Sequence, residues 1–278
     1  MRRLAALLLM LIAAGIALPL IAQESDEAQK SGFLRFIEDR ISSPSRRIAI
    51  NGLEGALSSD LRIAEITISD AEGVWLRIDN AQLNWDQAAL LTGRLQINSL
   101  TADSIDYIRP AVPPEGVTPP APEAGAIDVP ELPVAVFLEE LSVPQVTFGE
   151  DLFGLGSEIS VAGRLVLEGG SLDTNLDIDR LDGPGGNLSL NLKYDRESTN
   201  ADIDLALTEP RDGVIVNLLG MEGKPELSLR VQGSGPFTDI DTELTLDADG
   251  KRALTGVARL NSTADGLDID ADLNGPIA

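Results

Sequence analysis

The segment Leu267-Asp268-Ile269-Asp270-Ala271-Asp272-Leu273 alternates apolar residues with aspartates along its whole length. Successive side chains of a β-strand point to opposite faces, so this segment predicts a strand with one aliphatic and one anionic face. Ile203-Asp204-Leu205-Ala206-Leu207 repeats the pattern, and similar segments recur through most of the chain. The sequence therefore predicts a mainly β fold, a long antiparallel meander curled into a groove with an apolar inner face.

Asp-Gly pairs separate many of the expected strands, and they favour the tight turns of β-hairpins. They occur at Asp182-Gly183, Asp212-Gly213, Asp249-Gly250 and Asp265-Gly266. The segment Trp85 to Leu91 is typical of one helical turn between two strands. The expected strands span 47–50, 61–69, 74–79, 82–85, 94–108 with a break near 98–99, 135–141, 145–148, 158–167, 174–178, 188–194, 201–207, 213–218, 226–232, 241–247, 253–261 and 267–273.

The first 22 residues contain the one membrane-length apolar stretch, Leu4 to Ala22, which follows Arg2 and Arg3. As a helix this stretch is about 28 Å long, close to the ~30 Å core of a bilayer. The preceding arginines place the N-terminus in the cytoplasm and the bulk of the chain outside it. The pattern favours an uncleaved signal anchor, and a cleaved signal peptide is the alternative.

Residues 23–45 comprise a polar segment and an expected amphipathic helix near Ser31 to Ile41. Its apolar side chains recur at helical spacing beside basic residues. Two interpretations fit: a helix lying on anionic headgroups, or a helix that caps the open end of the sheet. The candidate membrane-surface residues are Phe33, Phe36, Ile37, Arg35 and Arg40.

The rest of the chain divides into a first β segment, 46–109, a Pro-rich loop, 110–133, and a second β segment, 134–278. Pro-rich stretches favour extended conformations and do not continue a sheet ladder. We expect the second β segment to continue past Ala278.

Composition excludes several classes of function. The chain has no Cys and no His, and its net charge is −24. The missing residues remove thiolate chemistry and the commonest general base, and the charge repels nucleic acid phosphates. We therefore expect no enzyme activity, no cofactor, no metal site and no nucleic-acid partner.

Only ten residues are aromatic, six Phe, two Trp and two Tyr. Compact β-sandwiches usually bury several large rings, so the expected aliphatic face is not filled by the protein alone. An ordinary sandwich with an aliphatic core is the alternative. The candidate groove residues alternate along the later strands: Leu188, Leu190, Leu192, Ile203, Leu205, Leu207, Leu244, Leu246, Leu267, Ile269 and Leu273.

Residues 32–110 resemble the N-terminal part of the TamB family, the inner-membrane subunits of the bacterial translocation and assembly module. The resemblance lies in the segments GFLRFIED (32–39), INGLEGALSS (50–59), IAEITISDAEGVWL (63–76) and WDQAALLTGR (85–94), followed by the Pro-rich loop. The family's C-terminal domain is not in this sequence, so contacts assigned to that domain do not carry over.

The resemblance implies a single-pass inner-membrane protein with most of its chain in the periplasm. It implies phospholipid transport between the inner and outer membranes, assembly of outer-membrane proteins, or both, with a TamA-like barrel as partner through the missing C-terminal part. The alternatives are a periplasmic chaperone or docking scaffold for β-barrel or autotransporter secretion, and a structural β stalk.

Overall fold

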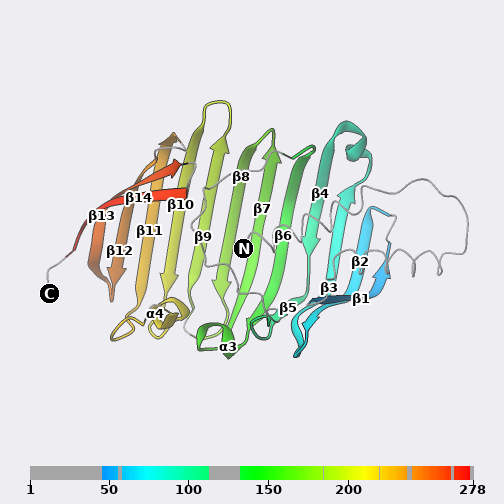
Figure 1. Cartoon of the computed structure of the whole chain (residues 1–278), viewed down its shortest axis with the longest axis horizontal. Coiled ribbons are helices and arrows are strands. Elements are labelled where there is room, and N and C mark those ends of the chain that lie inside the picture. The colour runs from blue at the N-terminus through cyan, green and yellow to red at the C-terminus, as the bar shows by residue number, and fades with distance from the viewer. Residues whose placement is uncertain are drawn as a thin grey trace, which may run out of the picture.

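The computed structural model describes residues 46–55, 58–112, 132–183, 185–218, 220–236, 240–263 and 266–275. These residues form one 14-stranded sheet, and from β6 to β14 each strand lies beside the next strand along the chain. Figure 1 shows the strands side by side across the whole molecule. The mainly β fold predicted from the alternating pattern is confirmed.

The first β segment contains four full strands, one short strand and a 3-10 turn: β1 (Arg47–Glu54), β2 (Asp60–Asp70), β3 (Gly73–Asp86), η1 (Ala88–Thr92), β4 (Arg94–Thr101) and β5 (Ser104–Tyr107). The second contains the remaining strands and two short helices: β6 (Ala135–Phe148), α3 (Glu150–Phe153), β7 (Ser157–Glu168), β8 (Ser171–Arg180), β9 (Asn187–Asp195), β10 (Asn200–Glu209), α4 (Val214–Leu218), β11 (Leu227–Pro236), β12 (Ile240–Ala248), β13 (Lys251–Thr263) and β14 (Gly266–Asn274). Both helices lie at the same end of the strands, which we call the helical rim (Figure 1).

The expected antiparallel meander is interrupted once. β6 pairs in parallel with both β4 and β5, whereas every other strand pairing among the described residues is antiparallel. A parallel neighbour requires a long crossover connection, which a hairpin cannot provide. The chain between β5 and β6 contains the Pro-rich loop, most of which lies outside the described residues.

Several expected elements are wrong in detail. The strands expected at 74–79 and 82–85 form the single strand β3, and those expected at 135–141 and 145–148 form the single strand β6, because Asn80 and Pro144 are accommodated inside continuous strands. The break in the long strand 94–108 falls at Ala102 and Asp103, between β4 and β5, and not near Asn98. The segment expected as strand 213–218 forms the helix α4 instead. Its β-branched residues favour a strand, but the carboxylate of Glu209 accepts hydrogen bonds from the backbone N–H groups of Ile215 and Val216 and thereby caps a helical turn.

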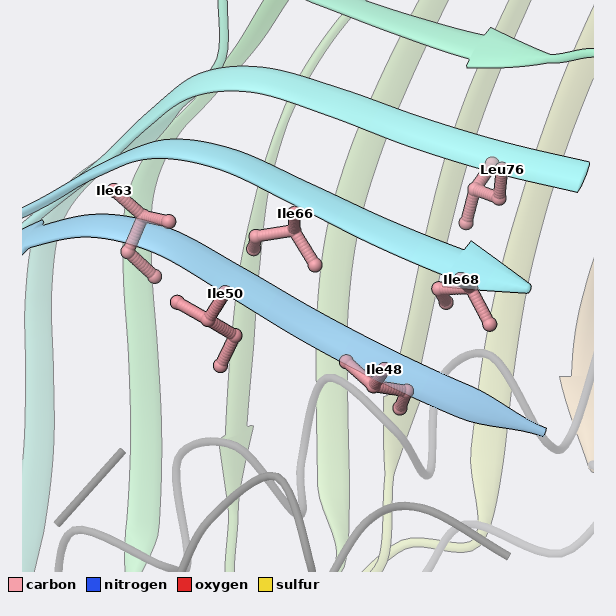
Figure 2. Close-up of a cluster of buried hydrophobic side chains, with 6 residues drawn as sticks. All are labelled: Ile48, Ile50, Ile63, Ile66, Ile68 and Leu76. Atoms are coloured by element: carbon pink, nitrogen blue, oxygen red, sulfur yellow. The ribbon is translucent and has the colours of Figure 1, made fainter. Parts of the chain in front are cut away.

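A row of irregular residues crosses the first three strands. Gly52 and Asn80 have positive φ angles of 66° and 50°, and the register places Ala64 between them on β2. At this row of the sheet the alternation on β2 also changes. Ile63 joins the same cluster as Ile66, although strict alternation would separate them (Figure 2).

β6 contains two bulges, which keep its apolar side chains on one face. Its register against β7 shifts between Leu138 and Leu141, and again between Val143 and Val146. Each bulge adds one residue to β6, so these four apolar side chains keep the same face despite irregular spacing. The second bulge contains Pro144, which cannot donate a ladder hydrogen bond.

Most of the buried hydrophobic side chains form three clusters in the strands from β1 to β7, and a few more, such as Val216, Leu227 and Ile240, are buried singly beyond β8. The first comprises Ile48, Ile50, Ile63, Ile66, Ile68 and Leu76 (Figure 2). The second comprises Leu95, Ile97, Val136, Leu138 and Leu167, and the third comprises Ala102, Val143 and Val146. A chain of contacting rings, Trp75, Tyr107, Phe148 and Phe153, runs from β3 to α3 at the helical rim.

Candidate functional site

The predicted groove residues of β9 and β10 lie opposite one another. Leu188, Leu190 and Leu192 of β9 pair with Leu207, Leu205 and Ile203 of β10, respectively. The row through Leu205 continues to Val231 on β11 and then to Leu244 on β12. Paired residues of antiparallel strands point to the same face, so the sheet has a continuous surface of aliphatic side chains, which we call the aliphatic face.

The same face contains residues that were missing from the predicted set. Leu176 and Ile178 of β8 pair with Leu190 and Leu188, and Leu229 of β11 pairs with Leu207. Both strands were expected, and their period-two alternation was sufficient to place these side chains. Leu246 joins through its pairing with Leu229.

Most aliphatic side chains from β8 to β12 are only partly buried, whereas Leu227 and Ile240 at the strand ends are buried. Each of the predicted residues Leu188, Leu190, Leu192, Ile203, Leu205, Leu207, Leu244 and Leu246 is half-buried. Leu273 of β14 is 41% exposed. For Leu267 and Ile269 the structure describes only the backbone, which pairs with β13. The predicted residues are therefore brought together, on a surface that water still reaches.

The opposite face, which we call the acidic face, carries the aspartates that alternate with the leucines. Asp204 accepts hydrogen bonds from Arg230 (3.1 Å) and Gln232 (3.1 Å) on β11, and Asp241 accepts one from Arg259 (2.9 Å). Exposed ion pairs of this kind contribute little to stability. These pairs keep the charges of this face in contact with water.

Two arginine–aspartate clamps fix the helical rim. In the first, Asp70 at the end of β2 accepts hydrogen bonds from Arg109 at 2.6 and 2.9 Å and from the backbone N–H of Val112 at 2.7 Å. The Asp70 side chain is 2% exposed. The hydrogen bonds from Arg109 hold the pKa of Asp70 well below its usual range.

In the second clamp, Asp182 accepts hydrogen bonds from Arg180 at 2.8 and 3.0 Å and from the backbone N–H of Glu158 at 2.9 Å. The hydrogen bonds from Arg180 lower the pKa of Asp182 to about 2, against the opposing effect of partial burial. Each clamp ties the end of one strand to a neighbouring connection, and so holds the rim in place.

The predicted membrane-surface residues Phe33, Phe36, Ile37, Arg35 and Arg40 lie outside the described residues, as does the apolar stretch Leu4 to Ala22. Within the part of the chain that the structure describes, no helix has the length and apolar character needed to cross a membrane. No group of three or more acidic side chains suited to a metal ion occurs in that part either.

Comparison with known proteins identifies no relative. No protein-family profile, no curated protein and no solved structure matches the chain. The likeness of residues 32–110 to the TamB family therefore stays a prediction from sequence, and the functional argument depends on the sheet itself.

Proposed function

We propose that this chain binds the acyl tails of phospholipid on the aliphatic face of its sheet. The observation that carries the proposal is the row of aliphatic side chains from Leu190 through Leu205 and Val231 to Leu244, each only half-buried. A contiguous apolar surface that water reaches is a binding surface more often than it is part of a finished core.

The chemistry of the face suits hydrocarbon chains. Its side chains are mainly Leu, Ile and Val, which offer no hydrogen bonds to orient a polar ligand. Covering such a surface stabilises a complex by roughly 25 cal/mol for each Å² of apolar area removed from water. A tail is then held without specific contacts, while the headgroup stays in water at a rim of the sheet.

The cellular context follows from the sequence resemblance. We propose a single-pass protein of the inner membrane, with its sheet in the periplasm as a groove for phospholipid transport between the two membranes. Assembly of outer-membrane proteins with a TamA-like barrel is the second role that the resemblance suggests.

The test is the lipid content of the purified full chain and of two single variants, measured by solvent extraction and mass spectrometry. Leu205→Asp places a charge on the aliphatic face, whereas Ala206→Asp places the same charge on the next residue, which points to the acidic face. We expect stoichiometric phospholipid in the wild type and in Ala206→Asp, and its loss in Leu205→Asp.

A wild-type chain that folds without lipid would contradict the proposal, and so would equal lipid content in the two variants. The first result would favour a β stalk. Binding of unfolded barrel segments by a lipid-free chain would favour the chaperone role, in which an incoming strand adds to a sheet edge.

A further inference from the structure

The aliphatic face changes character along the sheet. From β1 to β6 it contains tightly packed clusters, with exposed fractions of 3% for Ile48, 3% for Ile68, 2% for Leu95 and 1% for Ile97. From β8 to β12 the leucines of the middle rows, from Leu176 to Leu246, are half-buried, and the buried side chains Leu227, Ile240 and Thr242 lie near the strand ends. The middle of the same face is thus closed at one end of the sheet and open at the other.

Shared residues connect the first and third clusters of the closed end. Ile78 and Ile105 pack against both the first cluster, which contains Ile66, and the third cluster, which contains Val146. Protein interiors are packed at the density of organic crystals, so a lipid tail can enter only by separating side chains that already contact one another.

The boundary falls at β7 and β8. Leu167 of β7 is 7% exposed and belongs to the second cluster, and Leu172 of β8 packs against that cluster. Beyond Leu172, Leu176 and Ile178 pair with the half-buried leucines of β9. Strands lie about 4.8 Å apart, so the open part from β8 to β13 is about 24 Å wide. One tail needs about 15 Å, half of the ~30 Å bilayer core.

We infer that phospholipid tails occupy the aliphatic face only from β8 onward, and that β1 to β6 form a closed end that lipid does not enter. The inference rests on the proposed function and adds to it which part of the face lipid can reach. Lipid does not move along the face from the N-terminal side, because the packed clusters block that path. Lipid exchanges across the rims of the open part.

The experiment maps lipid contacts on the unmodified chain. The full chain is reconstituted in nanodiscs that contain phosphatidylethanolamine with a photoactivatable diazirine at the end of one tail. After irradiation, proteolysis and mass spectrometry locate the adducts, and adducts on the nanodisc scaffold protein confirm that the photochemistry worked. The Leu205→Asp and Ala206→Asp variants are treated in the same way.

We expect adducts on peptides of β8 to β13 to exceed those on peptides of β1 to β6 by at least about tenfold, equivalent to about 1.4 kcal/mol. Leu205→Asp should remove them and Ala206→Asp should retain them. Comparable labelling of both ends would overturn the closed end but leave lipid binding intact. Labelling of the scaffold protein without any labelling of the sheet would overturn the proposed function and this inference together.

Discussion

The two ends of this sheet share one alternating pattern but differ in how the strands are built. The end from β1 to β6 contains left-handed residues at Gly52 and Asn80, bulges in β6 and a parallel crossover, and it contains most of the buried hydrophobic side chains. The end from β8 to β14 is almost regular, with a single register shift between Leu246 and Asp247. Irregular strands therefore accompany close packing, and regular strands accompany an open face.

The physical reason lies in what each irregularity does. A regular strand presents one face of evenly spaced side chains, and nothing in its own geometry brings them closer together. A positive φ or a bulge changes the local twist and re-aims side chains, so apolar residues such as Leu138 and Leu141 of β6 can stay on one face despite their odd spacing. Because the two ends differ in packing, we expect the same kind of substitution to lower the free energy of unfolding more at the packed end than at the open end.

The largest expected difference is between Ile97→Ala at the packed end and Leu205→Ala at the open end. Ile97 is 1% exposed, and its truncation should lower the free energy of unfolding by about 3 kcal/mol, because it leaves a cavity. Leu205 is half-buried, so its truncation should lower this free energy by about 1 kcal/mol. Urea unfolding followed by circular dichroism measures both, and equal losses would contradict the division of the sheet.

The second comparison concerns two glycines with nearly equal φ angles. Gly52 has φ 66°, and a Cβ there would lie 2.6 Å from the Cβ of Ala64. Gly250 has φ 69° in the β12–β13 turn, and a Cβ there meets nothing within 4 Å. Gly250→Ala should lower the free energy of unfolding by about 1 kcal/mol, from backbone strain alone. Gly52→Ala adds a steric clash to the same strain.

We expect Gly52→Ala to lower the urea midpoint by more than Gly250→Ala, because a methyl group at position 52 would overlap the Cβ of Ala64. Equal shifts would show that the irregular row is not needed for packing of the first cluster.

Alternation in the sequence was sufficient to predict most strands and the shared face of Leu190, Leu205 and Leu244, because a strand's side-chain period is fixed by its backbone. Alternation does not predict what covers a face. Ile66 and Leu205 have the same pattern around them, yet one is 8% exposed and the other is half-buried. That difference depends on contacts between distant strands.

The segments whose structure was predicted wrongly also depend on contacts that lie beyond the local sequence pattern. Val214, Ile215 and Val216 favour a strand by local preference, and Glu209, which precedes them by only a few residues, makes them helical through hydrogen bonds to the backbone. The parallel pairing of β6 depends on the path of the intervening chain, which a local pattern does not specify.

The third comparison uses the two clamps at the helical rim. The folded-state pKa values of Asp70 and Asp182 lie below the unfolded value of about 3.9, so each clamp stabilises the fold fully above pH ~3.9. This contribution is lost as the pH falls through the folded-state value, about 2 for Asp182. Asp70→Asn and Asp182→Asn should each lower the melting temperature at pH 7 and flatten its decline in acid.

Asp70→Asn should have the larger effect, because the side chain of Asp70 is 2% exposed and that of Asp182 is 32% exposed. Melting curves from pH 7 down to pH 2 test this order. An acid decline as steep in both variants as in the wild type would mean that other carboxylates control the acid stability.

The smallest expected effect is local and concerns α4. The carboxylate of Glu209 is nearly buried and accepts backbone N–H bonds from Ile215 at 2.8 and 3.0 Å and from Val216 at 3.2 Å. Glu209→Gln keeps one acceptor oxygen but replaces the other with an amide nitrogen that cannot accept. Exchange of these two amide protons should accelerate by about tenfold, equivalent to loss of about one hydrogen bond.

The matched control is Glu226→Gln, which changes an exposed carboxylate just before β11 and should leave the same amide protons unchanged. Amide protons within β9 and β10 should also exchange as in the wild type, because the ladder between Leu190 and Leu205 does not involve Glu209. Faster exchange throughout these strands would contradict a local role. It would mean that the open end depends on its rim for stability, as the packed end depends on its clusters.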